Sequence, residues 1–308
     1  MDTNFIVIFS YFIVIYRIVQ LYEVLIAMSF QNQFTKTTTD ANLMETVHHG
    51  SAEYPFRYYY ENIALFDFKC IDWHWHSELE FIYIKSGNVV FDIGTVHFEL
   101  NEGNGIMINS KILHRLQSSS DAIIPNFLFQ PSFIAPQDSL IYKKYINPVI
   151  SSSLEYLVFQ PDIPWQKKAL EIIKTIITVQ ETEFNREIIV SMSVQQLWIL
   201  LLENLTFDQF ENMGAVISRT RLQLMMQYVH AHYSENITLE DIARTANISK
   251  STALHLFQNN LKLTPVKYLI NYRLKQAALL LINTEEKIAT ISNNTGFNNV
   301  DHFCRTFK

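Results

Sequence analysis

The chain of 308 residues is 48% hydrophobic and 18% charged, an ordinary globular composition that is long enough for two domains. Its two cysteines, Cys70 and Cys304, lie far apart, which argues against a disulfide framework and agrees with a reducing cytoplasm. The net charge of −6 would argue against a nucleic-acid partner if it were spread evenly.

The charge is concentrated differently in the two parts of the chain. Residues 216–308 contain eleven Lys or Arg and six Asp or Glu, a net charge of +5. Residues 1–215 therefore contain thirteen Lys or Arg and twenty-four Asp or Glu, a net charge of −11. A basic part joined to an acidic part is typical of a protein in which one half meets phosphate, so we predict a C-terminal domain that binds nucleic acid.

The first 43 residues include an apolar run, FIVIFSYFIVIY, at residues 5–16. This run is shorter than the ~20 residues that a membrane span needs, and extending it to Met28 brings in Arg17 and Glu23. The leader MDTN is acidic, unlike the basic start of a signal peptide. We interpret residues 1–43 as an apolar N-terminal extension without an assigned role, and a membrane anchor is the less favoured alternative.

Short β-branched and aromatic runs recur between Tyr54 and Phe133, among them IALFDFKCI, LEFIYIKSG and NVVFDIG. Turns rich in Gly, Asn and Ser separate these runs. This spacing favours a small antiparallel barrel within residues 44–160.

One stretch of this region, WHWHSELEFIYIKSG at residues 73–87, concentrates side chains that can coordinate a metal. Interpreted as a single strand with a period of two, it places four potential ligands on one face: His74, His76, Glu78 and Glu80. The other face would carry Trp73 and Trp75. One face of the predicted strand is therefore built from coordinating groups.

The order His-x-His, three residues, Glu, six residues, Gly within this stretch resembles the first motif of the cupin barrels. A second segment, GNGIMINSKILH, places a histidine where cupins have their last one, although the usual Pro-x-Gly before it reads Asn109–Lys111. The resemblance implies a set of three imidazoles and one carboxylate: His74, His76, Glu80 and His114. Such a set suits a divalent metal such as Fe, Mn, Ni or Zn. The same four residues are our candidates for effector binding, with or without a metal.

Two strongly apolar helices are predicted after the barrel, from about Trp165 to Gln180 and from Ile188 to Leu205. Both carry more apolar surface than a helix that faces solvent needs. Two explanations remain open, because the helices can pack on their own barrel or form a dimer interface. We assign residues 161–206 to a helical dimerisation region and residues 207–217 to a linker.

The rest of the chain is predicted to be helical and contains a diverged repeat. Residues 237–257, ITLEDIARTANISKSTALHLF, are echoed by residues 287–307, KIATISNNTGFNNVDHFCRTF. Each copy has the pattern of a short helix, a tight turn and a second helix that ends in Phe. The sequence therefore predicts two helix-turn-helix units.

Local signals support this prediction. Thr238 and Asp241 form a capping-box pattern before the first unit. Asn247 and Gly296 stand where each turn favours a left-handed residue. Thr264, followed by a proline, has the pattern of an N-cap and predicts one long helix between the two units.

The connecting helix and the second unit carry a series of residues at fixed spacing: Tyr268-Leu269, Arg273-Leu274, Ala277, Leu280-Leu281, Thr284, Ile288, Ile291, Gly296-Phe297, Phe303, Arg305 and Phe307-Lys308. The series resembles the DNA-binding module of the AraC family of transcription regulators. Together with the cupin-like half, the resemblance covers residues 54–308. Family members usually continue past the last Phe-Lys with a turn and a further helix, so we expect the module, residues 218–308, to be truncated.

The resemblance implies that the second helix of each unit enters a major groove of DNA. The first such helix starts near Ser249 and offers five candidates for DNA contact: Lys250, Ser251, Thr252, Leu254 and His255. The second starts near Asn299 and offers four: Val300, Asp301, His302 and Arg305. For each residue the alternative is a place on a solvated helix surface.

The fold we expect is α+β and multidomain, with an N-terminal cupin-like antiparallel β-barrel plus helices and a C-terminal all-α double helix-turn-helix domain. The favoured function is a cytoplasmic, homodimeric transcription regulator that binds a double-stranded DNA operator and responds to a small-molecule effector, for example a sugar. It would contact RNA polymerase if it is an activator. The alternative is a metal-dependent cupin enzyme fused to a DNA-binding module. No catalytic residue is predicted, and a divalent metal in the barrel is the only cofactor considered.

A sugar effector would favour aromatic side chains in its pocket, because a sugar ring stacks on flat apolar surfaces. Four aromatic residues are candidates: Tyr58, Tyr60, Trp73 and Trp75. Packing in the core is the favoured role for most of them.

Overall fold

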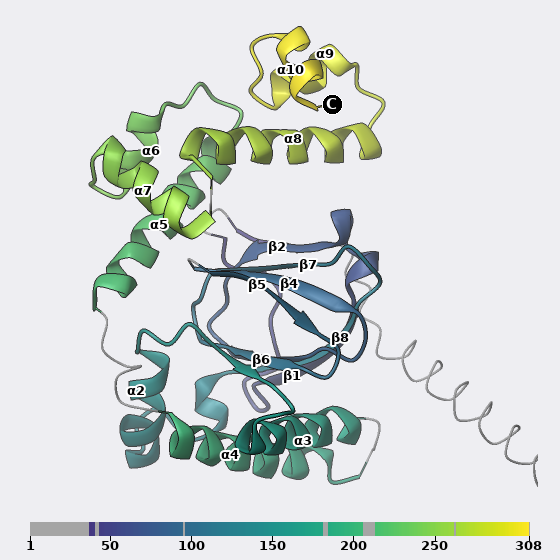
Figure 1. The fold of residues 1–308 in the computed structure, drawn as a ribbon, viewed down its shortest axis with the longest axis vertical. Helices are drawn as coiled ribbons and strands as arrows, with labels where there is room; N and C mark the ends of the chain where they lie inside the picture. The colour runs from purple at the N-terminus through teal and green to yellow at the C-terminus, as the bar shows by residue number, and fades with distance from the viewer. Residues whose placement is uncertain are drawn as a thin grey trace, which may run out of the picture.

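The computed structural model describes residues 37–40, 43–94, 96–180, 184–205, 213–261 and 263–307. The apolar run at residues 5–16 and most of the predicted linker lie outside this part of the chain. The described residues form a β-barrel with two long helices against its lower side and an all-helical domain above it (Figure 1). Among them, no helix combines the length and the apolar character that crossing a membrane requires.

In the described part of the chain, nine strands in two antiparallel sheets form the barrel, as the alternating sequence pattern predicts. The five-stranded sheet has the order β1 (Phe56–Asn62), β8 (Ile123–Phe129), β3 (Leu79–Tyr83), β6 (Gly105–Ile108) and β9 (Tyr156–Phe159). The four-stranded sheet has the order β2 (Cys70–His74), β7 (His114–Gln117), β4 (Asn88–Ile93) and β5 (Val96–Asn101). In β4, Val89, Phe91 and Ile93 are fully buried while their neighbours are partly exposed, so one face of this strand builds the core between the sheets.

The stretch from Trp73 to Gly87 is not one strand, and this prediction is wrong. It is divided between the two sheets, because β2 ends at His74 and β3 begins at Leu79. Between them Trp75 forms an isolated bridge with Met44, and the Lys111 amide donates a 2.8 Å hydrogen bond to the His76 carbonyl. The chain therefore turns a corner of the barrel here, which a simple period of two cannot show.

Below the five-stranded sheet, short helical turns lead into two long helices. The turns are η3 (Pro131–Phe133), η4 (Tyr142–Ile146) and α2 (Asn147–Ile150), and the long helices are α3 (Pro164–Val179) and α4 (Arg186–Asn204). Both long helices were predicted and are confirmed. Leu170 and Ile173 of α3 share a buried cluster with Phe81 and Phe127 of the sheet, so part of their apolar surface packs on their own barrel.

The described residues of the C-terminal domain form six helices: α5 (Met213–His232), α6 (Leu239–Thr245), α7 (Lys250–Leu261), α8 (Pro265–Asn283), α9 (Ile288–Asn294) and α10 (Val300–Phe307). The pairs α6–α7 and α9–α10 are the two predicted helix-turn-helix units, and α8 connects them. The fold class predicted from the sequence is confirmed.

The helix caps and turn residues predicted for the C-terminal domain are found in the structure. The Thr238 and Asp241 side chains form a complete capping box at α6, and Thr264 Oγ1 accepts a 3.2 Å hydrogen bond from the Lys267 amide at the start of α8. Asn247 and Gly296 both have positive φ, at 51° and 80°. A Cβ on Gly296 would lie 2.6 Å from the Tyr233 carbonyl oxygen, so glycine is required there for space as well as for conformation.

Candidate functional site

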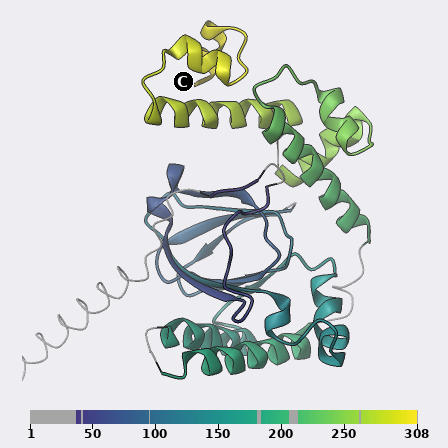
Figure 2. The same ribbon diagram turned by 180° about the vertical axis from the view of Figure 1, so that it is seen from behind.

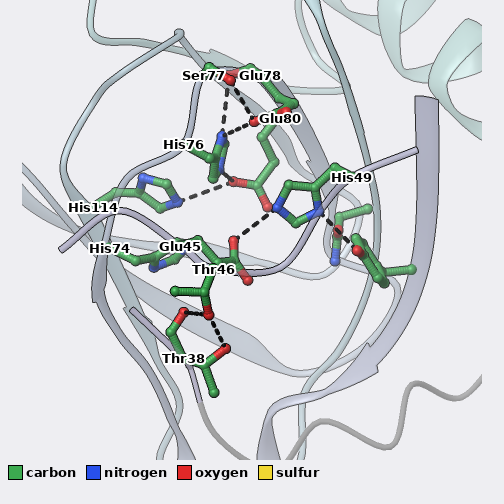
Figure 3. Close-up of polar contacts among 12 residues, drawn as sticks. Thr38, Glu45, Thr46, His49, His74, His76, Ser77, Glu78, Glu80 and His114 are labelled. Carbon is green, nitrogen blue, oxygen red and sulfur yellow. Dashed lines mark hydrogen bonds and ion pairs between the residues drawn. The ribbon is translucent and has the colours of Figure 1, made fainter. Parts of the chain in front are cut away.

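Three histidines meet in the interior of the barrel (Figure 3). His74 ends β2, His76 lies in the corner that follows, and His114 begins β7 directly opposite His74 in the sheet register. Each is at most 4% exposed, and the rings of His74 and His114 have centroids 4.1 Å apart. One ring nitrogen from each residue lies within 4.8 Å of the others.

Backbone carbonyls fix the proton on the same nitrogen of all three rings. Nδ1 of His74 donates to the Asp72 carbonyl at 2.7 Å, that of His114 to the Ile112 carbonyl at 2.8 Å, and that of His76 to the Glu78 carbonyl at 3.3 Å. A carbonyl oxygen only accepts, so Nδ1 carries the hydrogen and a neutral ring keeps its lone pair on Nε2. This carbonyl support of Nδ1 is the arrangement usual for histidines that bind a metal through Nε2.

Glu80 completes the cluster from β3. Its Oε2 lies 3.3 Å from Nε2 of His76 and 3.2 Å from Nε2 of His114. The Nε2 atom of His114 is nevertheless buried without a partner in hydrogen-bond geometry. A buried polar atom without a partner is costly, and a bound cation would satisfy it.

The electrostatics of the cluster keep Glu80 ionised and His74 neutral, whereas for His76 burial is outweighed by the contact with Glu80, which raises the pKa of His76. Burial alone would raise the pKa of Glu80, but the contacts with His114 and His76 outweigh it and hold this pKa well below its usual range. Burial, with the neighbouring His114, lowers the pKa of His74 to about 4, so this ring is neutral at physiological pH. A neutral imidazole and an ionised carboxylate are the forms that bind metals.

The structure brings together all four residues of the predicted ligand set, His74, His76, Glu80 and His114, and this set fits a divalent cation. One ring nitrogen from each histidine and a carboxylate oxygen of Glu80 lie together in the buried cluster, a donor set that suits Fe, Mn, Ni or Zn. Glu78, which the single-strand interpretation placed on the same face, accepts hydrogen bonds from the Gln130 and Ser77 side chains instead.

A second polar group beside the histidines was missed by the sequence analysis. His49 Nε2 donates to Glu45 Oε2 at 3.1 Å, so its Nδ1 is free to accept from the Tyr59 hydroxyl at 2.8 Å (Figure 3). On the neighbouring strands, Asn126 Nδ2 donates to Glu61 Oε2 at 2.7 Å. These residues come from the segment before β1, from β1 and from β8, so only the closure of the barrel brings them together.

His74 and Glu80 of the first group and all the residues of the second group line a cavity of about 40 Å³. Its polar lining comes from Thr37, Glu45, His49, Tyr59, Glu61, His74, Glu80 and Asn126. Burial, with the negative charge of Glu80, raises the pKa of Glu61 to about 8, so this carboxyl is mainly protonated at neutral pH and can donate a hydrogen bond. None of the described residues around the cavity is a lysine or an arginine.

The aromatic residues considered for sugar stacking lie elsewhere. Trp73 and Trp75 pack in the cluster between the barrel and the helical domain. Tyr58 packs against the cluster under α3 and α4, and Tyr60 carries the Lys85 ammonium 5.1 Å from its ring centroid. The aromatic side chains that do line the cavity are Tyr59 and Phe66.

The candidate DNA-contacting residues lie on α7 and α10. The exposed ones are Lys250, Ser251, Thr252, His255, Asp301, His302 and Arg305, and the half-buried ones are Leu254 and Val300. Ser249 and Asn299 cap the two helices, because their side-chain oxygens accept from the Thr252 and His302 amides. Most of the predicted set is thus open to a partner, although Lys250 Nζ lies 3.1 Å from Glu240 Oε2.

Comparisons with known proteins match both halves of the chain. The family model of the AraC-like ligand binding domain matches residues 66–136, and that of a helix-turn-helix domain matches residues 242–308. The uncharacterized HTH-type transcriptional regulator YdeC of Bacillus subtilis is 32% identical over 276 residues, which are 87% of this chain and 93% of the relative. The lactose operon transcription activator of Staphylococcus xylosus is 25% identical over 58% of this chain and 66% of its own length.

Proposed function

Because the chain belongs to the AraC family of transcription regulators, we propose that α7 and α10 read adjacent major grooves of an operator and that occupancy of the barrel changes how they do so. The protein is a DNA-binding regulator with an N-terminal ligand-binding domain. The observation that carries the proposal is that α7 and α10 leave most of their predicted contact residues exposed while their Phe257 and Phe303 are buried.

The division of labour follows from the two halves. We propose residues 44–160 as the effector-binding barrel, 161–206 as the dimerisation region, 207–217 as the linker and 218–308 as the DNA-binding domain. The net charge of +5 on residues 216–308 supports the last assignment, since lysines and arginines that neutralise phosphates supply most non-specific affinity. The protein would act in the cytoplasm, and as an activator it would also contact RNA polymerase.

For the barrel we propose a neutral, hydroxyl-bearing effector, for example a sugar, beside a divalent cation. The absence of lysine and arginine among the described lining residues disfavours an anionic effector. The Glu61 carboxyl, the Asn126 amide and the Glu45 carboxylate supply the donors and acceptors that hydroxyl groups need. The lactose activator among the relatives supports a sugar. When bound, the metal would supply Lewis-acid coordination for an effector oxygen.

The dimer would form through α4. This helix leaves Met192 and Ile199 65% and 57% exposed although its opposite side is buried against α3. Ile199 and Trp198 also border a groove of about 750 Å³ between α4 and the η4 and α2 turns. A second copy of the same surface would cover these apolar side chains, as a two-fold dimer does.

The assignment of the DNA-contacting residues can be tested by selecting bound sequences from a pool of random duplexes with the full chain. We expect Thr252→Ala and Arg305→Ala to relax the preference at separate positions of the selected site. Gln258→Ala, an exposed change on α7 outside the predicted set, should leave the preference intact. Unchanged preference in both test variants would refute the assignment.

A metal-dependent enzyme with a DNA-binding domain is the second candidate, and the histidine cluster is the observation in its favour. Its relatives are transcription regulators, so we propose that the metal serves effector binding and that the chain has no turnover. Metal analysis of the purified chain should find about one divalent ion per chain, lost in the His76→Ala, His114→Ala double variant. A metal-free wild type would refute the cation.

A further inference from the structure

The helical domain is docked on the outer side of the barrel strand β2 (Figures 1 and 2). An apolar cluster joins Trp73 and Leu113 of the barrel to Met225 and Val229 of α5. Beside it, the Lys275 ammonium of α8 forms an ion pair with the Asp72 carboxylate across 203 residues of sequence. The two domains are therefore held by a contact that combines apolar packing with one specific charge pair.

An aromatic stack continues this contact. The His230 ring of α5 stacks on Tyr272 of α8 with centroids 3.8 Å apart, and its Nε2 lies 2.7 Å from the Tyr268 hydroxyl. His230, Tyr272 and Lys275 border the same small cavity as Asp72. Most of the side chains that meet the barrel thus come from α5 and α8, the helices that support both units, and Leu261 at the end of α7 lies beside them.

A β-bulge in β2 creates the docking surface. Pairing with β7 shifts register between Ile71 and His74. Ile71 and His74 line the cavity inside the barrel, whereas Asp72 and Trp73 both line cavities against the helical domain. In a regular strand one of two successive side chains would point inward, so the bulge is what turns both toward α8.

The bulge is bonded to the histidine site. The Asp72 carbonyl accepts the 2.7 Å hydrogen bond from His74 Nδ1, and the Asp72 carboxylate holds Lys275. One residue therefore contacts both the histidine cluster and the DNA-binding domain. The corresponding hydrogen bond of His114 goes to the Ile112 carbonyl, and Ile112 packs in the core of the barrel and not against α8.

We propose that the β2 bulge is the element that couples the barrel site to the DNA-binding domain. The Asp72–Lys275 pair holds α8 against the four-stranded sheet, and a change at His74 shifts the equilibrium between docked and released domains. The exposed residues of α7 and α10 lie outside this contact. Docking therefore fixes the position of both helix-turn-helix units relative to the barrel without covering their predicted DNA-contacting side chains. The inference rests on the proposed role of the barrel as the effector site.

The chain carries its own probe for docking. Cys70 is partly buried and borders the cavity of about 110 Å³ between the domains, while Cys304 is exposed on α10. Burial raises the pKa of the Cys70 thiol to about 11, and the positive charge of Lys275 opposes this increase. Removing Lys275 without undocking would therefore slow alkylation of Cys70, because less of it would be thiolate. Faster alkylation must come from greater exposure.

The first test compares the alkylation of Cys70 by iodoacetamide with that of Cys304 in the same full-length molecule, measured by peptide mass spectrometry. We expect Lys275→Gln to raise the ratio of the Cys70 alkylation rate to the Cys304 alkylation rate at least threefold. Lys267→Gln, which changes an exposed lysine of the same helix, should leave the ratio at the wild-type value. Equal ratios in the two variants would overturn the role of the ion pair.

The second test asks whether the signal passes through His74. Without any added ligand, His74→Ala should raise the same ratio and His114→Ala should not. His74→Asn should restore the wild-type ratio, because its amide nitrogen can replace Nδ1 as the donor to the Asp72 carbonyl. Equal ratios in the His74→Ala and His114→Ala variants would overturn the coupling. If the wild type does not bind Co²⁺, the proposed cation is refuted. The coupling through His74 is still judged by the alkylation ratios of the two variants alone.

Discussion

The two helix-turn-helix units repeat one pattern, but cores of very different size support them. Ile242, Ala253 and Phe257 of the first unit belong to a large apolar cluster that continues through α5 to the barrel. Phe297 and Phe303 of the second unit form a small separate cluster with Ile291 and Ala277. We therefore expect the two repeats to differ in stability according to what they pack against, and among the described residues the first alone shares an apolar cluster with the barrel.

The largest expected difference concerns the central phenylalanine of each unit. Phe257→Ala should cost ~3–5 kcal/mol and destabilise the whole helical domain, because Phe257 is fully buried in the shared cluster. Phe303→Ala should melt only α9 and α10, since its cluster is small and joins these two helices only to one face of α8. Hydrogen exchange should show lost protection from residue 217 onward in the first variant and only from about residue 288 in the second. The same pattern in both variants would show that the two units form one cooperative core.

A low-pH experiment should also separate the two units. Burial lowers the pKa of His230 to about 4, below its unfolded value of 6.5, so the folded domain holds this ring neutral. The unfolded chain then binds the proton more readily, and stability that is complete above pH 6.5 is lost as the pH falls toward 4. Allowing for the partial exposure of the ring, this loss is on the order of 2 kcal/mol.

The measurement is urea denaturation between pH 7 and pH 4, followed at the first unit. His230→Gln should flatten the part of the pH dependence that belongs to this domain. His302→Gln, a change at an exposed histidine of the second unit, should not. An unchanged pH profile in His230→Gln would contradict the explanation.

Gly296 is the position where the second unit depends on its neighbours for geometry. Gly296→Ala should cost at least ~1–2 kcal/mol for the left-handed backbone alone, and its Cβ would also collide with the Tyr233 carbonyl oxygen. The corresponding turn residue of the first unit, Asn247, also has positive φ, so Asn247→Gly should change stability little. Denaturation midpoints of the two variants test this, and a tolerated Gly296→Ala would mean that the second unit shifts freely on α8.

Those features that depend on neighbouring residues could be predicted from the sequence. The capping box at Thr238, the turns at Asn247 and Gly296 and the spacing of His74, His76 and Glu80 are each contained within a few residues. The chemistry of such a segment limits its conformation wherever it lies in the fold. This is why the helices and the residues of the ligand set could be predicted from the sequence.

The features that could not be predicted join distant segments. The strand break after His74 depends on how the two sheets meet, and the place of Glu45 and His49 depends on a segment before β1 that pairs with Trp75 through Met44. Asp72 and Lys275 are separated by 203 residues, and the bulge that exposes Asp72 has no distinct sequence pattern. Barrel closure and domain docking decide these contacts.

The smallest expected effect concerns the helix caps, because α6 begins with a capping box and α9 begins without a side-chain cap. Thr238 caps α6 through its side chain, whereas Lys287, at the same place before α9, makes no such bond. Thr238→Ala should therefore cost ~1 kcal/mol. Lys287→Thr should stabilise the second unit by less than about this amount, because its hydroxyl can accept from the Thr290 amide, which already donates to the Lys287 carbonyl at 2.8 Å.

Hydrogen exchange in α6 and α9 checks both changes, and Lys287→Ala is the matched control that removes the charge without adding an acceptor. Glu285 and Glu286 precede Lys287, so loss of its positive charge affects both substitutions equally and cancels in the comparison. If Lys287→Thr protects α9 no more than Lys287→Ala does, the weaker second unit is limited by its small apolar cluster and not by its missing cap.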